Sequence, residues 1–172
     1  MSASLATSHV DAPETSSIEI VSPEALHSEA VRAAVAYWNA LRANRPYPRR
    51  DELLPAAMAK FLRHIVLVRV LGGGADYEYR VVGDAHVQAQ GYNFRHMRLK
   101  EIEALRVDFA TRATYEHVRI TALPFAVRGW IGRYESRSRF SYHETAFLPL
   151  GAGGVVDHLL IVSTYVPRGV RA

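Results

Sequence analysis

Residues 77–91, with the sequence YEYRVVGDAHVQAQG, decide how the rest of the chain is arranged. The first six letters alternate between two sides and predict a β-strand. The alternation stops at Gly83, after which Asp84 can cap a short helix that ends at Gly91. A strand that runs directly into a glycine-terminated helix predicts that the chain leaves a sheet here and crosses it as a lid.

Composition indicates one globular domain with its own core, because 49% of the 172 residues are hydrophobic and 22% are charged. The absence of cysteine excludes disulfides, thiol catalysis and cysteine-based zinc sites. No apolar run is long enough to cross a bilayer, and residues 1–17 lack the basic and apolar regions of a secretion signal. We therefore expect a cytoplasmic protein without membrane insertion.

The basic residues favour arginine strongly, since Lys60 and Lys100 are the only lysines among 21 basic residues. An arginine fork suits the two-pronged binding of carboxylate or phosphate. The arginines are spread along the chain, and acids such as Glu135 and Glu144 intrude among them. A nucleic-acid site requires a broad basic face with interleaved aromatic residues, so no nucleic-acid partner is predicted.

The N-terminal region divides into a tail and a helix. Residues 1–21 are rich in Ser, Thr and Ala and predict a mobile tail, in which residues 18–21 can dock as a short extended piece. The single domain then comprises residues 22–172, and Ser22, Pro23 and Glu24 predict the start of a helix over about 23–43. Its apolar stripe covers the sheet or forms a homodimer contact, and the contact residues would be Val31, Val35 and Trp38.

Strand and turn patterns fill the rest of the core, about residues 55–167. Strands are predicted at 64–71, 77–82, 125–131, 137–150 and 155–166. The first and last are apolar on both sides and should be central neighbours. The order predicts an α+β fold with a five-stranded antiparallel sheet, a helical crossover over residues 84–122 on one face and the N-terminal helix on the other.

This order resembles the PAS fold, and the residues resemble the small single-domain PAS-like proteins common in alphaproteobacteria. The pieces that carry the resemblance are 37–42 (YWNALR), 45–48 (RPYP), 50–51 (RD), 55–56 (PA), 64–67 (HIVL), 79–83 (YRVVG), Gly91 and 148–150 (LPL). PAS domains are sensory and dimerising modules with a pocket between the sheet and the crossover. The resemblance therefore implies a regulator rather than a catalyst, and it names no ligand.

A ligand pocket between sheet and crossover would be mostly apolar with a few polar groups. We expect its lining to be Val81, Val87, Tyr92, Phe109, Ala113, Phe125, Val127, Tyr142 and Glu144. Glu144 shares the apolar face of its strand, so its carboxylate needs a ligand or a partner, for which Arg128 is the nearest candidate. The alternative is a core that side chains fill completely.

Other chemistry is disfavoured by its context. Gly72–Gly74 precedes a strand rather than a helix, so it predicts a turn and not a phosphate loop. His86, His96 and His117 lie in the crossover without metal-ligand spacing, so no metal is predicted and no cofactor is assigned. Ser136, Ser138 and Ser141 lack a nucleophile-elbow sequence, so we expect no enzymatic activity.

An anion-binding patch is a further hypothesis, formed by Arg128, Arg133, Arg137 and Arg139 on two consecutive strands and their turn. The alternative is a solvated edge of the sheet. The sequence thus favours a non-enzymatic sensor that binds a small ligand under the lid, residues 84–103, and contacts a signalling protein. The second hypothesis is a ligand-free dimerisation scaffold.

Overall fold

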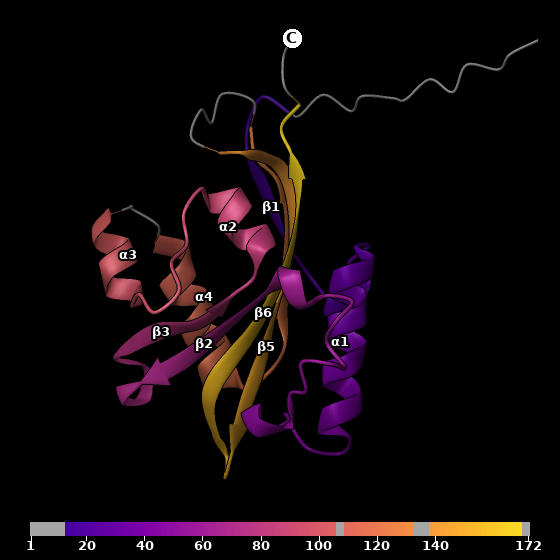
Figure 1. The fold of residues 1–172 in the computed structure, drawn as a ribbon, viewed down its shortest axis with the longest axis vertical. Helices are drawn as coiled ribbons and strands as arrows, with labels where there is room; N and C mark the ends of the chain where they lie inside the picture. The colour runs from indigo at the N-terminus through magenta and orange to yellow at the C-terminus, as the bar shows by residue number, and fades with distance from the viewer. Residues whose placement is uncertain (1–12, 106–108, 133–137, 170–172) are drawn as a thin grey trace, which may run out of the picture.

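The computed structural model describes residues 13–105, 109–132 and 138–169, and its centre is one antiparallel sheet in the strand order β1-β4-β5-β6-β2-β3. The strands are β1 (Ser17–Val21), β2 (Ile65–Leu71), β3 (Asp76–Val82), β4 (Phe125–Trp130), β5 (Phe140–Ala152) and β6 (Val155–Pro167). Helix α1 (Glu29–Arg42) covers one face (Figure 1). The crossover helices α2 (Asp84–Gln90), α3 (Leu99–Leu105) and α4 (Phe109–Thr121) cover the other. This arrangement confirms the predicted α+β class.

The sheet has six strands rather than five, because β1 pairs along β4 as an edge strand. This segment was predicted to belong to a mobile tail in which residues 18–21 can dock as a short extended piece, and it is this docked form that the structure shows. Two features fix it: the Glu19 carboxylate lies 2.9 Å from Arg128 Nε, and Gly129 lets the backbone of Ser17 approach. A side chain at Gly129 would meet the Ser17 carbonyl oxygen at 2.4 Å. A short strand of this kind depends on its neighbour and leaves little signal in its own sequence.

Helix α1 begins at Glu29, six residues later than the sequence predicted. Pro23–Ala25 forms a separate 3₁₀ turn, and Leu26 then enters the core in an extended conformation with 1% of its surface exposed. The helix is capped by the Ser28 side chain, which accepts from the backbone N–H of Val31 at 3.5 Å. The burial of Leu26 therefore interrupts what reads in the sequence as one helix.

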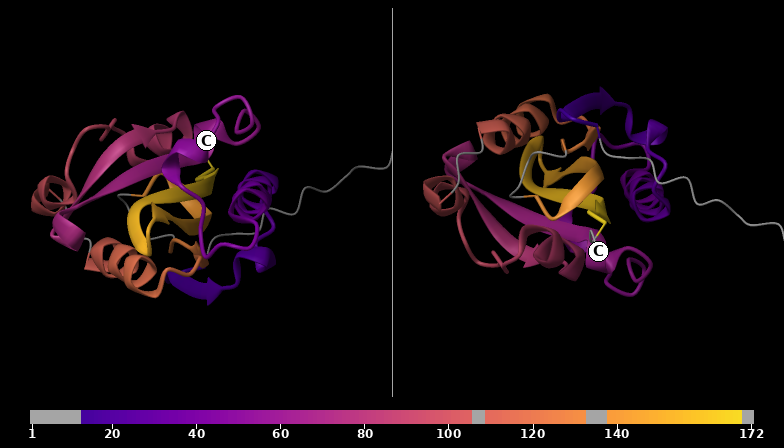
Figure 2. Two further views of the ribbon diagram at one scale, coloured as in Figure 1. Left: turned by 90° about the horizontal axis from the view of Figure 1, so that it is seen from below. Right: turned by 90° about the horizontal axis from the view of Figure 1, so that it is seen from above.

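Helix α1 lies against the sheet of its own chain (Figure 2), in contact with β5 and β6. Val31, Val35 and Trp38 are all buried, and the indole N–H of Trp38 donates to the carbonyl oxygen of Pro149 at 2.8 Å. The prediction that these three residues form a dimer contact is therefore wrong. The alternative that the stripe covers the sheet is correct, because the same spacing serves both purposes.

The strand-to-helix turn predicted within residues 77–91 forms, although Gly83 and not Asp84 occupies the N-cap position. Gly83 approaches the backbone of Arg63 so closely that a Cβ atom would lie 2.2 Å from the Arg63 carbonyl oxygen. At the other end, Gly91 terminates α2 with φ of 84°. The two glycines thus bound α2, which contacts β6 and the 3₁₀ turn Leu62–His64. Strands β2 and β6 are neighbours in the sheet, as predicted.

The segment after α2 protects the other edge of the sheet. The backbone of Tyr79 donates to the Met97 carbonyl at 3.0 Å and accepts from His96 N–H at 2.7 Å. An isolated bridge between Glu78 and Arg98 extends this pairing. The loop therefore satisfies the free edge of β3 and places the start of α3 beside the sheet.

Candidate functional site

A cavity of about 240 Å³ lies between the sheet and the crossover helices. Its walls come from β2, β3, β5 and β6 and from α2, α3, α4 and the loop between α2 and α3. The lining residues are Val66, Tyr79, His86, Gln90, Tyr92, Phe94, Leu99, Ile102, Glu103, Thr111, Tyr115, Phe140, His143, Thr145, Phe147, Ile161, Ser163 and Tyr165. The cavity occupies the place that the sequence predicted for a pocket, between sheet and crossover.

Aromatic rings form most of the apolar wall. Tyr79 and Phe94 meet edge to face, with ring centroids 4.9 Å apart, and Tyr92 continues the row 5.8 Å from Phe94. At another side, Phe140 and Tyr165 lie 4.7 Å apart in a tilted pair. Such pairs are stable and directional, and they offer flat surfaces to a planar ligand.

A row of uncharged polar groups crosses the sheet side of the cavity. It arises because Thr145 pairs with Ser163, and His143 with Tyr165, in the β5–β6 register. The hydroxyls of Thr145 and Ser163 lie 2.8 Å apart, and His143 Nδ1 lies 3.4 Å from Thr145 Oγ1. Burial lowers the pKa of His143, which keeps this imidazole neutral at neutral pH.

His86 completes this polar row from α2. Its Nε2 lies 2.8 Å from the carbonyl oxygen of His64, so Nε2 carries the proton and donates. Nδ1 is then an acceptor for the Tyr165 hydroxyl, 3.1 Å away. Burial lowers the pKa of His86 to about 4 and raises the pKa of Tyr165, so both groups are uncharged at neutral pH.

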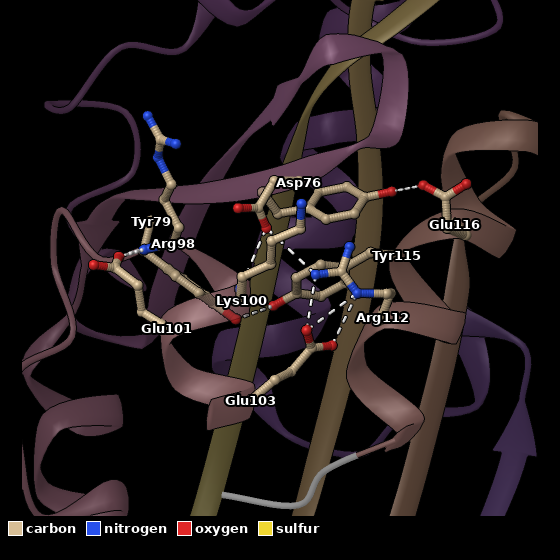
Figure 3. Close-up of polar contacts among 10 residues, drawn as sticks. Asp76, Tyr79, Arg98, Lys100, Glu101, Glu103, Arg112, Tyr115 and Glu116 are labelled. Carbon is tan, nitrogen blue, oxygen red and sulfur yellow. Dashed lines mark hydrogen bonds and ion pairs between the residues drawn. The ribbon is translucent and has the colours of Figure 1, made fainter. Parts of the chain in front are cut away.

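An ion-pair cluster at the far side of the crossover joins α3 and α4 to the sheet (Figure 3). Arg112 on α4 contacts both carboxylate oxygens of Glu103 on α3, at 2.8 and 2.9 Å, and reaches Asp76 on β3 at 3.4 Å. The hydroxyls of Tyr79 and Tyr115 lie 3.1 Å apart beside it. Glu103 lines the cavity, and its charge is already balanced by Arg112.

Most of the residues predicted for the pocket lie elsewhere, and among those whose side chains are described only Tyr92 lines the cavity. Ala113 is exposed, Val81, Val87 and Val127 are half-buried outside the cavity, and Phe125 packs against the rings of His117 and Phe147. The side chain of Phe109 lies outside the described residues. Tyr142 and Glu144 are on the α1 face of β5, one step out of phase with the cavity-lining residues His143, Thr145 and Phe147.

Glu144 has a structural role in place of the predicted ligand contact. Its Oε2 accepts from the backbone N–H groups of His27 and Ser28 at 2.9 and 2.8 Å, and its Oε1 accepts from the Tyr142 hydroxyl at 3.0 Å. Burial, and in second place the hydrogen bond to this carboxylate, raises the pKa of Tyr142 to about 12. The partner that the buried carboxylate requires is thus the backbone before α1, and not Arg128.

The four arginines of the predicted anion patch do not form one cluster in the described residues. Arg128 pairs with Glu19, while the Arg139 guanidinium lies against Gly91 at the end of α2. Arg133 and Arg137 lie outside the described residues. Within the described part of the chain, no group of three His, Asp or Glu side chains could hold a metal ion, and His96 and His117 are exposed, away from the buried His86.

The cavity and the fold define a class, the α+β domains in which a helical crossover closes a chamber against an antiparallel sheet. Residues 26–157 match the PAS domain family, so the chain belongs to that family. No curated protein matches the chain. The family suggests a sensory or regulatory module. None of the described helices is long and apolar enough to span a membrane.

The cavity residues that the sequence analysis missed carried one usable signal. Thr145 and Ser163 face each other in the β5–β6 register, and each has a second polar residue two positions away on the same side, His143 and Tyr165 respectively. Aligning these polar pairs across the last hairpin would have identified the cavity face. The contribution of His86 from α2 has no comparable signal, because it depends on how α2 docks.

Proposed function

We propose that this PAS domain is a non-enzymatic sensory or regulatory module that binds one small molecule in the cavity. The supporting observation is a chamber in which aromatic rings face a row of uncharged hydrogen-bonding groups, the usual form of a small-molecule site. Its 240 Å³ is below the common range of about 300–1,000 Å³, and it equals about eight waters at ~30 Å³ each. The ligand is therefore small.

The lid, residues 84–103, supplies His86, Tyr92 and Phe94 to the cavity, so occupancy bears directly on its position. A ligand that binds one arrangement of the lid better shifts the population toward it. A signalling protein that recognises α2 or α3 would then bind differently to the ligand-occupied and the empty domain. We expect this interaction to take place in the cytoplasm. Homodimerisation stays a prediction and would require surfaces other than Val31, Val35 and Trp38.

Filling the cavity tests this proposal. Ile102 lines the cavity from α3, whereas Leu105 on the same helix is 70% exposed and lies outside it, so Ile102→Trp and Leu105→Trp form a matched pair. Native mass spectrometry of protein purified from its own host should show a retained small molecule in the wild type and in Leu105→Trp. The same molecule should be absent from Ile102→Trp.

Circular dichroism establishes that both variants are folded. When the identified molecule is added back, it should raise the melting temperature of the wild type and of Leu105→Trp, because a ligand stabilises the state that binds it. It should not raise the melting temperature of Ile102→Trp. Wild-type protein that carries no small molecule from its host would instead support the ligand-free scaffold. Equal retention by both variants would place the molecule outside the cavity.

A further inference from the structure

A second concavity, a groove of about 440 Å³, borders the cavity on the α2 side. Its lining residues are Arg63, His64, Ala85, Gln88, Ala89, Arg139, Phe140, Tyr165 and Pro167. Phe140 and Tyr165 line both the groove and the cavity, and their rings pack 4.7 Å apart. This ring pair is therefore the partition between the two spaces.

The groove differs from the cavity in charge. Arg139 lies in it with its guanidinium against Gly91, and no acidic group in the described part of the chain pairs with Arg139. Arg63 faces Asp84 at 3.4 Å, but both side chains are more than half exposed, so water screens this pair. Burial lowers the pKa of His64, which leaves its ring uncharged at neutral pH. The groove thus offers a guanidinium fork that no carboxylate in residues 13–105, 109–132 and 138–169 occupies.

The described lining residues of the cavity, in contrast, offer no free charge. Its carboxylate, Glu103, is held by Arg112, and His86, His143 and Tyr165 are uncharged at neutral pH. An ionised group placed there would lose its hydration without gaining a partner of opposite charge. In the groove, the same group would meet an arginine fork while staying in contact with water.

We infer that the groove is the entrance to the cavity and that Arg139 selects a ligand with one carboxylate on a small, planar apolar body. The body passes the Phe140–Tyr165 pair and lies among the aromatic rings, and the carboxylate stays in the groove at Arg139. This inference rests on the proposed function, since it names the ligand class for the same cavity.

Two probes of equal shape and different charge test it: benzoate, and its neutral isostere benzamide. The variants are Arg139→Gln and the control Arg69→Gln, which removes an exposed arginine of β2 outside both spaces. We expect Arg139→Gln to lower the affinity for benzoate, measured by calorimetry, about ten-fold. This is the scale of one hydrogen bond to a charged group. Arg69→Gln should leave the affinity for benzoate unchanged. Benzamide should bind more weakly than benzoate, and neither substitution should change its affinity. Added salt should weaken benzoate alone.

Arg139 also lies at the end of α2, where a cation can simply stabilise a helix. That role alone would lower the melting temperature of Arg139→Gln and weaken both probes equally, which would overturn the inference. The cavity-filling Ile102→Trp variant supplies the second condition, because it should abolish benzoate binding. If the affinity for benzoate falls in Arg139→Gln but stays the same in Ile102→Trp, benzoate binds the groove alone. That outcome would also overturn the inference.

The inference and the proposed function fail in different ways. A neutral molecule retained from the host, or benzamide that binds as well as benzoate, overturns the carboxylate selection and leaves the cavity as a ligand site. Host protein without any small molecule, together with no binding of either probe, overturns both. A retained carboxylic acid that Arg139→Gln loses and Arg69→Gln keeps supports both.

Discussion

Glu144 on β5 accepts a hydrogen bond from the backbone N–H of Ser28, the N-cap residue of α1, at 2.8 Å, although 116 residues separate them. The adjoining N–H of His27 donates to the same oxygen at 2.9 Å. A carboxylate beside the first turn of a helix also interacts favourably with the helix dipole. One sheet residue therefore fixes where α1 begins and how it lies on the sheet.

Removal of this carboxylate should destabilise the fold. Glu144→Ala leaves two backbone donors and the Tyr142 hydroxyl without their acceptor, so we expect a loss of about 3 kcal/mol in the free energy of unfolding. Glu144→Gln retains one amide oxygen as an acceptor and should cost about half as much. Urea denaturation measures both, with the exposed Glu24→Ala as the control. Equal stability of the wild type and Glu144→Ala would contradict this role.

The buried indole of Trp38 gives a second prediction, which concerns stability and oligomeric state together. Trp38→Phe removes the hydrogen bond to the Pro149 carbonyl and should lower the free energy of unfolding by about 1–2 kcal/mol. Because Trp38 is 1% exposed, the mass measured by light scattering should stay the same at concentrations where the variant is folded. A folded variant that changes from dimer to monomer would show that Trp38 acts at an interface after all.

The fold was predictable because its signals are local. The glycines that end the strand at Gly83 and the helix at Gly91, and the two strands that are apolar on both sides, fix the connections and the centre of the sheet. The edge strand β1 was not predictable in the same way, since its order comes from pairing with β4 and from the Glu19–Arg128 contact. Those partners are more than 100 residues distant.

The site was less predictable because a β-strand has two faces. In β5 the more apolar face packs under α1, and the mixed face with His143 and Thr145 lines the cavity. Choosing the apolar face moved every pocket residue on β5 to the wrong side of the sheet. A cavity wall needs hydrogen-bonding groups, so the less apolar face is the better candidate in a sheet covered on both sides.

The buried His86 predicts a pH dependence of stability. Its folded pKa of about 4 is below the ordinary value of 6.5, so between these values the unfolded chain binds a proton that the folded protein does not. The contribution of the neutral His86 to the free energy of unfolding is complete above pH 6.5. This contribution is lost as the pH falls toward 4, at about 1.4 kcal/mol per pH unit and about 3 kcal/mol in total.

His86→Gln should remove this part of the slope, so the stability difference between wild type and variant should shrink as the pH falls from 6.5 to 4. Urea denaturation at several pH values measures it. Carboxylates, His64 and His143 titrate in both proteins, so the difference isolates His86. A constant difference across that range would show that the imidazole charges as easily in the folded protein as in the unfolded chain.

The contact of Arg112 with Glu103 and Asp76 should hold α3 in place, since it is the ion pair that ties α3 to α4 and both to β3. Arg112→Met leaves the buried Asp76 carboxylate without its cation. We expect the free energy of unfolding to fall by about 2 kcal/mol. This is less than for a fully buried pair, because Arg112 is partly exposed. Hydrogen exchange of α3 should accelerate more than that of α1. Arg119→Met is the control, because Arg119 pairs with Glu116 within α4 alone. If both variants loosen α3 to the same degree, the ion pair does not hold α3, and packing of Leu99 and Ile102 must do so.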